Sequence, residues 1–151
     1  MSHHKNNVKR DHFRCRWSVC NKHLWETLNN LGCVPNKSLI LQFPNISIFK
    51  NVDLIRHFIR GYVDGDGCIS WKDKNHTKYT LSILGTKQFL ESINSQLPNL
   101  MYLYKPKNKS VYELKSTQKT LMSILNYLYK DSTIYLQRKY DRYLSAVQLS
   151  N

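Results

Sequence analysis

The sequence has few acidic residues, few cysteines and no long apolar run. Ten Asp and Glu residues stand against 23 Lys and Arg residues in a chain of 151, so the formal net charge is +13. No apolar run approaches the roughly 18 residues that a membrane-spanning helix needs, and the N-terminus lacks the apolar core of a secretory signal. We therefore expect no membrane association and no secretion, and a location in the cytoplasm or an organellar matrix.

The spacing of the cysteines does not fit the common zinc and disulfide scaffolds. Such scaffolds use close pairs, for example two cysteines separated by two residues. The nearest pair here is Cys15 and Cys20, and Cys33 and Cys68 lie much farther along the chain. We interpret all four as reduced, packed thiols.

Basic residues are concentrated at the two ends of the chain. Residues 1–16 carry a net charge of +4 and residues 105–151 a net charge of +6, whereas the middle is closer to neutral. An excess of this size favours a polyanionic partner, with nucleic acid ahead of an acidic membrane surface. Asp64 and Asp66 form an acidic pair within this basic chain, and this pair most needs an explanation.

Hydrophobic periodicity predicts an α+β chain with one modest core. A helix is expected over residues 21–31 and a short strand over residues 38–43. From residue 53 onward the predicted order is helix, two strands, helix, two strands, helix, helix. The strongest helix spans residues 53–65 and has an apolar stripe at helical spacing. Hairpins are predicted at 68–84 and 101–116, and the alternation in the first gives it one core face and one polar and basic face.

The chain divides into three predicted regions: a basic flexible arm at 1–14, a segment at 15–50 and the main domain at 51–151. Residues 18–31 (SVCNKHLWETLNNL) resemble residues 82–97 (SILGTKQFLESINSQL). Two interpretations stay open. Either the segment at 15–50 holds a remnant of a preceding copy of the same unit followed by a linker, or the likeness arises by chance, because many strand–helix junctions look alike.

The segment FIRGYVDGDGCIS, residues 58–70, breaks three local rules. Gly61 lies inside a helix, at a cost of roughly 1 kcal/mol relative to Ala. Gly61 and Gly65 are four residues apart, which leaves a flat strip where another helix could approach closely. Asp64 and Asp66 lie at the helix C-terminus, where the macrodipole disfavours anions. Such conflicts are typical of functional sites, and an acidic pair in a basic chain indicates a cation that bridges carboxylate and phosphate.

The nonapeptide IRGYVDGDG, residues 59–67, resembles the signature of the LAGLIDADG homing endonucleases, which also occurs in inteins and intron maturases. The predicted order of elements over residues 53–130 is similar to that family's αββαββα unit. The resemblance implies an α+β fold in which a saddle-shaped antiparallel sheet has its helices packed on one face. It also implies a site-specific DNA endonuclease that uses Mg2+ or another divalent metal and makes a staggered double-strand break.

The same resemblance implies roles for individual residues. Asp66, the last acidic residue of the motif, would bind the metal together with the carbonyl of Gly65. Lys115 would be the basic catalytic residue, although an ordinary exposed strand lysine is the other interpretation of this position. Only one motif is present, so the motif helix would pack against its counterpart in a second copy. The residues of that homodimer interface would be Phe58, Gly61, Tyr62 and Gly65.

The polar faces of the two hairpins are expected to bind double-stranded DNA. A two-stranded ribbon fits the major groove, where lysines contact phosphates and Ser or Thr side chains reach base edges. The predicted contact residues are Ser70, Lys72, Lys78, Thr80, Ser82, Lys105, Lys107 and Lys109.

Two hypotheses about function stay open. The motif carboxylate and Lys115 favour a metal-dependent endonuclease that acts as a homodimer on a pseudo-palindromic site. The incomplete N-terminal unit favours a non-cleaving module that retains the fold, such as an intron maturase or a DNA-binding regulator, and intron RNA would then be a partner. Neither the target sequence nor the host element follows from the residues.

Overall fold

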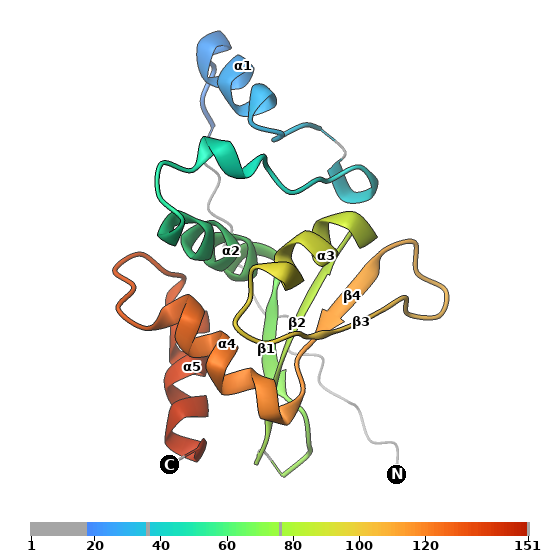
Figure 1. Ribbon diagram of the computed structural model, residues 1–151, viewed down its shortest axis with the longest axis vertical. Coiled ribbons are helices and arrows are strands. Elements are labelled where there is room, and N and C mark those ends of the chain that lie inside the picture. Colours follow the sequence, from blue (N-terminus) through green and yellow to red (C-terminus); the bar gives the residue numbers. More distant parts are fainter. Residues whose placement is uncertain (1–17, 36, 76, 151) are drawn as a thin grey trace, which may run out of the picture.

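The computed structural model describes residues 18–35, 37–75 and 77–150, and it has the predicted α+β architecture (Figure 1). From residue 53 the order of elements is the predicted one. The elements are α1 (Lys22–Asn30), η1 (Lys37–Leu39), η2 (Ile46–Ile48), α2 (Asp53–Asp66), β1 (Cys68–Trp71), β2 (Tyr79–Gly85), α3 (Lys87–Ser95), β3 (Tyr102–Tyr104), β4 (Tyr112–Lys115), α4 (Gln118–Tyr129) and α5 (Gln137–Ser150).

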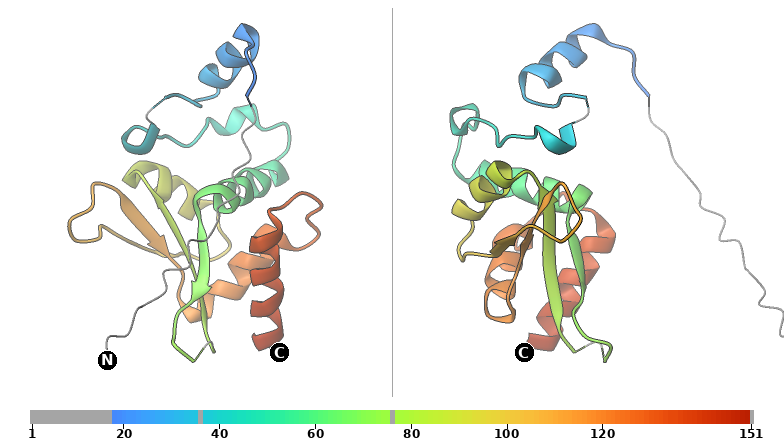
Figure 2. Two further views of the ribbon diagram at one scale, coloured as in Figure 1. Left: turned by 180° about the vertical axis from the view of Figure 1, so that it is seen from behind. Right: turned by 90° about the vertical axis from the view of Figure 1, so that its right-hand side faces the viewer.

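The four strands form one antiparallel sheet in the order β1-β2-β4-β3. Residues that lie directly opposite each other on paired strands point to the same face, so the register defines two faces. The inner face is buried under the helices, and its core residues include Ile69, Leu81, Ile83 and Leu114. The outer face lies on the other side of the sheet, toward the viewer in the left view of Figure 2.

The core lies between the inner face of the sheet and the helices. Ile55, Ile59 and Val63 recur at helical spacing and give α2 a buried stripe. The buried stripes of α3 and α4 follow the same spacing, and they consist of Phe89, Leu90 and Ile93 in α3 and of Leu121, Ile124, Leu125 and Leu128 in α4. Burial of such a stripe is the main source of stability for helices of this length.

Arg60 ties α2 to the C-terminal helices from within the protein. It is 6% exposed, and its guanidinium donates to the carbonyls of Ile134 (3.0 Å) and Leu128 (3.2 Å). The Arg60 Nη1 atom, which donates to Leu128, also lies 2.6 Å from Nδ1 of His57. Burial, and then the nearby Arg60 charge, lower the pKa of His57. A neutral His57 can therefore accept a hydrogen bond from Arg60 at this nitrogen.

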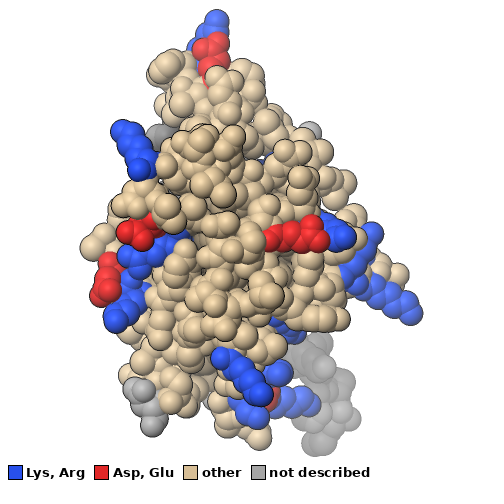
Figure 3. Space-filling model, in the orientation of Figure 1, with Lys and Arg blue, Asp and Glu red and all other residues tan. Residues whose placement is uncertain are grey.

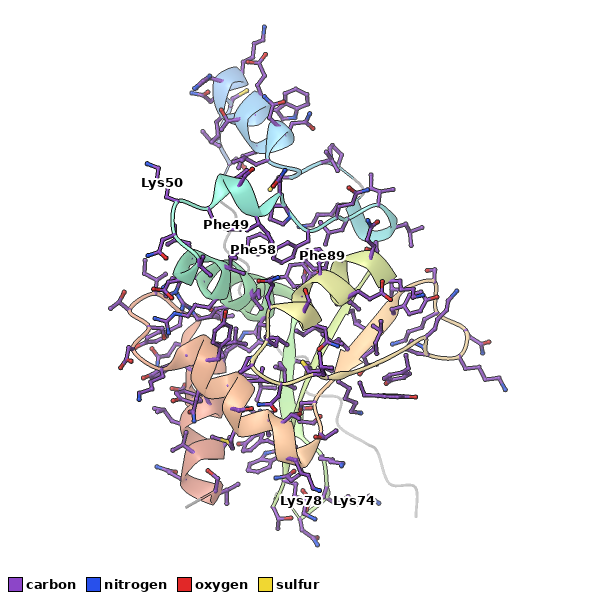
Figure 4. The ribbon with its side chains drawn as sticks, viewed as in Figure 1. Phe49, Lys50, Phe58, Lys74, Lys78 and Phe89 are labelled. Carbon is purple, nitrogen blue, oxygen red and sulfur yellow. The ribbon has the colours of Figure 1, made fainter. Side chains whose placement is uncertain are left out.

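Residues 37–49 pack across α2 and α3 through aromatic contacts. Phe43 meets Phe58 edge-on, with ring centroids 5.2 Å apart, and Phe49 lies 5.7 Å from Phe58. Phe43 also contacts Phe89 of α3 at 6.1 Å. Phe49, Phe58 and Phe89 lie along the boundary between this segment and the two helices in Figure 4. The segment thus covers part of the motif helix.

Several sequence-based expectations do not hold. Residues 38–43 do not form the predicted strand: η1 covers part of the segment and the rest is irregular. Cys20, Cys33 and Cys68 are exposed rather than packed. The helix predicted over residues 53–65 begins at Asp53 as expected, and the backbone N–H of Asp53 donates to the Asn51 side chain.

The predicted arm at 1–14 and Cys15 lie outside the described residues. In the part of the chain that the structure describes, no helix is long and apolar enough to cross a membrane.

Gly67 is required by a close approach of the backbone to Val63, and we predict that Gly67→Ala destabilises the protein. A Cβ at residue 67 would lie 2.7 Å from the Val63 carbonyl oxygen. The end of α2 would have to shift, at a cost of about 1–3 kcal/mol in the free energy of unfolding. Urea titration measures the loss. Cys68→Ala, at the exposed neighbouring position, is the matched control and should change stability by less than about 0.5 kcal/mol. Equal stabilities would contradict the prediction.

Candidate functional site

The two aspartates at the end of α2 have different surroundings. The Tyr129 hydroxyl donates to one oxygen of Asp64 at 2.6 Å, and the backbone N–H of Leu136 donates to the other at 3.0 Å. Asp66 is exposed, and no hydrogen bond or ion pair joins its carboxylate to another described residue. Asp64 therefore has a structural role, and only Asp66 is free to meet an external cation.

Tyr129 stays protonated and keeps donating to Asp64. Its side chain is fully buried. Burial first, and then the hydrogen bond to Asp64, raise the pKa of Tyr129 above its usual value. Because the partners lie 65 and 72 residues away from Asp64, this contact could not be found from local sequence patterns.

Lys139 holds the junction between α2 and β1 in place. Its ammonium group donates to the Gly67 carbonyl, and the side chain is 5% exposed. Burial is the main cause that lowers the pKa of Lys139. Asp66 thus lies between two anchored positions, Asp64 and Gly67, so its backbone is held although its own carboxylate has no described partner.

The register of the sheet places Lys115 level with the end of the motif. Cys68 lies opposite Ser82, Ser82 opposite Lys115, and Lys115 opposite Tyr102. These four residues form one row across the outer face. Neighbouring strands are about 4.8 Å apart, so the Cα atoms of Cys68 and Lys115 are separated by about 10 Å. Asp66 precedes Cys68, the first residue of β1, by two residues, and Lys115 is the last residue of β4. The two predicted catalytic residues therefore lie toward the same end of the sheet.

The predicted contact residues are distributed over the outer face and the hairpin tips. Ser70 and Ser82 are half-buried on the outer face, whereas Thr80 is 6% exposed, contrary to expectation, and its hydroxyl has no hydrogen-bond partner among the described residues. Lys and Arg side chains gather at the lower and right-hand edges of Figure 3, where the hairpins end. The exposed tip lysines are Lys72, Lys74, Lys78, Lys105, Lys107 and Lys109.

The turn between β1 and β2 has a defined conformation. Asp73 accepts hydrogen bonds from the Thr77 hydroxyl at 2.6 Å and from the backbone N–H of Lys78 at 2.8 Å. The bond from Thr77 is the main cause that lowers the pKa of Asp73. Lys74 and Lys78 both extend from this tip in Figure 4. The turn thus orders the backbone from which these two cations project.

The outer face also carries three residues that were not predicted from the sequence: Tyr102, Tyr104 and Glu113. Tyr102 is 65% exposed, and its ring stacks on that of Tyr104 with centroids 5.5 Å apart. Glu113 lies opposite Tyr104 in the register, and the hydrogen bond between them is the main cause that raises the pKa of Tyr104. Strict alternation along β3 and β4 was the signal that could have found them.

A pocket of about 290 Å³ lies beside the motif carboxylate. Lys37, Tyr62, Asp66 and Leu84 are among its lining residues. The Tyr62 hydroxyl donates to the Leu84 carbonyl at 2.9 Å. Burial, and then the charge of Asp66, raise the pKa of Tyr62 to about 12, so the phenol stays neutral beside the carboxylate. Lys37 comes from the segment before α2, and no sequence pattern pointed to it.

The four residues of the predicted dimer interface differ in accessibility. Gly61 and Gly65 are exposed, and a Cβ at either position would meet nothing within 4 Å. Phe58 is half-buried under Phe43 and Phe49. Tyr62 packs on Phe89 of α3 with ring centroids 4.6 Å apart. The glycine strip is therefore open, and its aromatic neighbours are covered in part by the same chain.

The site offers one carboxylate for a metal ion. The described residues contain no group of three or more His, Cys, Asp or Glu side chains that could hold one. The Asp66 carboxylate is an oxygen donor of the kind that Mg2+ prefers, and Mg2+ commonly combines one or two carboxylates with waters and substrate phosphates. Asp66 fits such an ion, provided that phosphate or a second chain completes the ligand set.

The separate roles of the two aspartates lead to a prediction about stability. Asp64→Ala leaves the buried Tyr129 hydroxyl without its acceptor and should lower the free energy of unfolding by about 1–3 kcal/mol. Asp66→Ala removes an exposed carboxylate without a described partner and should change it by less than about 0.5 kcal/mol. Urea titrations of the two variants measure the difference, and equal losses would refute the assignment of Asp64 as the structural residue.

The chain resembles known proteins in structure rather than in sequence. No family model matches the chain, and no curated protein matches it. The chain is similar to a crystal structure of the homing endonuclease I-CvuI, described as a complex with the I-CreI target in the presence of Mg in which the DNA is not cleaved. The TM-score is 0.48 and the sequence identity 22%, over 66% of this chain and 68% of that one.

Proposed function

We propose that the chain binds double-stranded DNA with the outer face of its sheet and cleaves it as a homodimer in a metal-dependent reaction. One observation carries the proposal: Asp66 has no described partner and lies two residues before Cys68, which shares a row of the outer face with Lys115, and the hairpin tips of this face are basic. Binding alone does not require an anion where phosphates would lie.

The charge and shape of the sheet support duplex binding. Each hairpin is a two-stranded ribbon of the kind that enters the major groove. The tip lysines lie at the far ends of the ribbons, where they would contact phosphates and position the protein. Ser82, Tyr102 and Glu113 lie between the tips, so they would face base edges. A glutamate there would accept a hydrogen bond from the cytosine amino group.

The chemistry follows from the surroundings of Asp66. The Asp66 carboxylate and the Gly65 carbonyl would hold a divalent metal ion, which, when bound, polarises a phosphoryl oxygen and helps ionise water. Lys115 would stabilise negative charge that develops on the phosphate. The Tyr62 phenol stays neutral next to Asp66, and both residues line the pocket. The anchored neighbours Asp64 and Gly67 hold the backbone of Asp66 in place.

Two copies would supply two carboxylates. Gly61 and Gly65 leave an open strip on α2, and glycine strips allow two helices to approach closely. Pairing of two such strips would bring the C-terminal ends of both α2 helices together, with one Asp66 from each chain. Each carboxylate would then serve one DNA strand, which gives a staggered double-strand break on a pseudo-palindromic site.

We predict that duplex binding depends steeply on salt. With about 6–10 phosphate contacts, affinity should fall about 10³–10⁵-fold between 50 and 200 mM salt. Replacing Lys72, Lys78 and Lys107 by Ala should lower the slope of log K against log salt by about 2.7. The matched control replaces three exposed basic residues that lie outside both the hairpins and residues 18–54, namely Lys87, Lys130 and Arg142. Fluorescence anisotropy with labelled duplex measures both slopes, and equal losses in the two variants would rule out the hairpin tips as the binding surface.

We predict metal-dependent cleavage that requires Asp66. A plasmid library of the genomic DNA that flanks the gene serves as substrate, with Mg2+ added or chelated. Asp66→Asn should lower the cleavage rate at least about 100-fold, and Lys115→Ala should also lower it, both with unchanged duplex affinity. Lys130→Ala should cleave like the original chain. Uncut DNA with every protein, including the unmodified one, would defeat the endonuclease proposal.

A non-cleaving nucleic-acid-binding module is the second candidate. The observation that favours it is the single metal-binding carboxylate, because no group of three or more such ligands exists among the described residues. An intron maturase or a regulator would keep the basic face and would not need Asp66. Steep salt dependence of binding by the unmodified chain, without cleavage in the presence of Mg2+, is the result that this candidate predicts.

A further inference from the structure

Helix α1 has the pattern of a core helix but no cover. It is amphipathic, yet none of its residues is buried. Trp25 is 59% exposed and Leu28 is 41% exposed. The helix lies beyond α2, at the end of the molecule away from the sheet, in all three ribbon views (Figures 1 and 2). A nine-residue helix without tertiary contacts is marginal in water, so its apolar stripe requires a partner.

Helix α3 has the same apolar pattern as α1, but in α3 the apolar residues are buried. Both helices have nine residues, and each begins with Lys after a cap whose side chain accepts a hydrogen bond from the third helical residue. Their apolar residues fall at the same three positions. These are fully buried in α3 (Phe89, Leu90 and Ile93) and poorly covered in α1 (Leu24, Trp25 and Leu28).

The exposed apolar surface extends from α1 to the motif helix. Leu31, at the end of α1, lines a groove of about 310 Å³ together with Ile40 and Ile48. Phe49 follows Ile48 and packs on Phe58 of α2, and Leu54, one turn before Phe58, is 42% exposed. Ten of the seventeen exposed large apolar side chains among the described residues lie within residues 18–54. We call this stretch, residues 18–54, the N-terminal apolar surface.

The N-terminal apolar surface is also the least charged part of the protein. Residues 18–54 contain three lysines and two acidic residues, a net charge of +1, in a chain of net charge +13. Nucleic acid is thus a poor occupant for it. Two copies of a chain with this charge repel each other, so they can associate only where cations are sparse. Depletion of charge at the centre is typical of protein–protein interfaces.

The glycine strip on α2 is too small to hold a dimer by itself. Its exposed positions are Leu54, Gly61 and Gly65. A stable specific interface buries about 800 Å² per partner and uses roughly 20–30 residues a side. The N-terminal apolar surface adjoins this strip through the Phe49–Phe58 contact and would add its own area to the area that the strip buries. A second copy is the occupant that we infer, because the same patch of both chains meets in a two-fold dimer, so neither partner brings additional charge to the contact.

We propose that the N-terminal apolar surface and the α2 strip form one continuous dimer interface, in which α1 of each chain is covered by the other chain. The inference rests on the proposed homodimer and extends it, since it assigns residues 18–54 to the interface. It also explains why α1 keeps a core-like stripe. In the monomer the helix frays, and in the dimer it becomes ordered.

The test is sedimentation equilibrium of the full chain over a range of concentrations, with and without duplex DNA. Trp25→Glu combined with Leu28→Glu should raise the dimer dissociation constant about 30-fold or more. Added glutamates lower the net positive charge, so reduced repulsion would act in the opposite direction. The matched control is Ile134→Glu with Leu144→Glu, which alters exposed apolar residues outside the N-terminal apolar surface and should change the constant less than about threefold.

A second measurement and a third variant separate the outcomes. Hydrogen exchange of the α1 amides should slow as protein concentration rises. Gly61→Leu tests the α2 strip by itself. If Gly61→Leu weakens the dimer while the α1 variant does not, the extended interface is wrong and the proposed homodimer stands. A monomer at every concentration, with and without DNA, overturns both, while the salt and cleavage experiments still report on nucleic-acid function.

Discussion

The hydrogen bond from the buried Tyr129 hydroxyl to Asp64 holds the end of α2 in place, and the candidate site depends on it. The same carboxylate accepts the Leu136 backbone N–H, so one side chain joins α2, α4 and the segment that leads into α5. Lys139 adds a bond to the Gly67 carbonyl. Asp66 lies between these anchors. Its position is therefore set by its neighbours, which leaves its carboxylate available for a ligand.

The protein separates two kinds of surface. The basic residues gather at the hairpin tips, where they attract a polyanion over a distance of about one Debye length. The N-terminal apolar surface lies beyond α2 and carries almost no net charge. This separation has a physical reason: association of two highly cationic chains requires an uncharged contact, whereas nucleic-acid binding requires a charged one.

Features set by neighbouring residues were predictable from the sequence. Thr86 and Thr117 cap α3 and α4 through side-chain bonds to residues three positions ahead. The alternation in β1 and β2 gave the correct faces for Ile69, Leu81 and Ile83. The glycines of the motif indicated an open strip, and Gly61 and Gly65 are indeed uncovered. Each of these signals lies within a few residues along the chain, where periodicity and capping operate.

The sequence by itself determined the α+β class, the order of elements from residue 53 and the excess of basic charge. Only the tertiary structure decided that Asp64 is bonded while Asp66 is free, because the partners of Asp64 come from distant segments. It likewise decided that residues 38–43 form no strand. A strand requires a neighbour with free backbone groups, and in the structure this segment packs against helices instead, with the Leu41 carbonyl accepting from Thr86. Local pattern sets which conformations are favourable, and long-range contacts select among them.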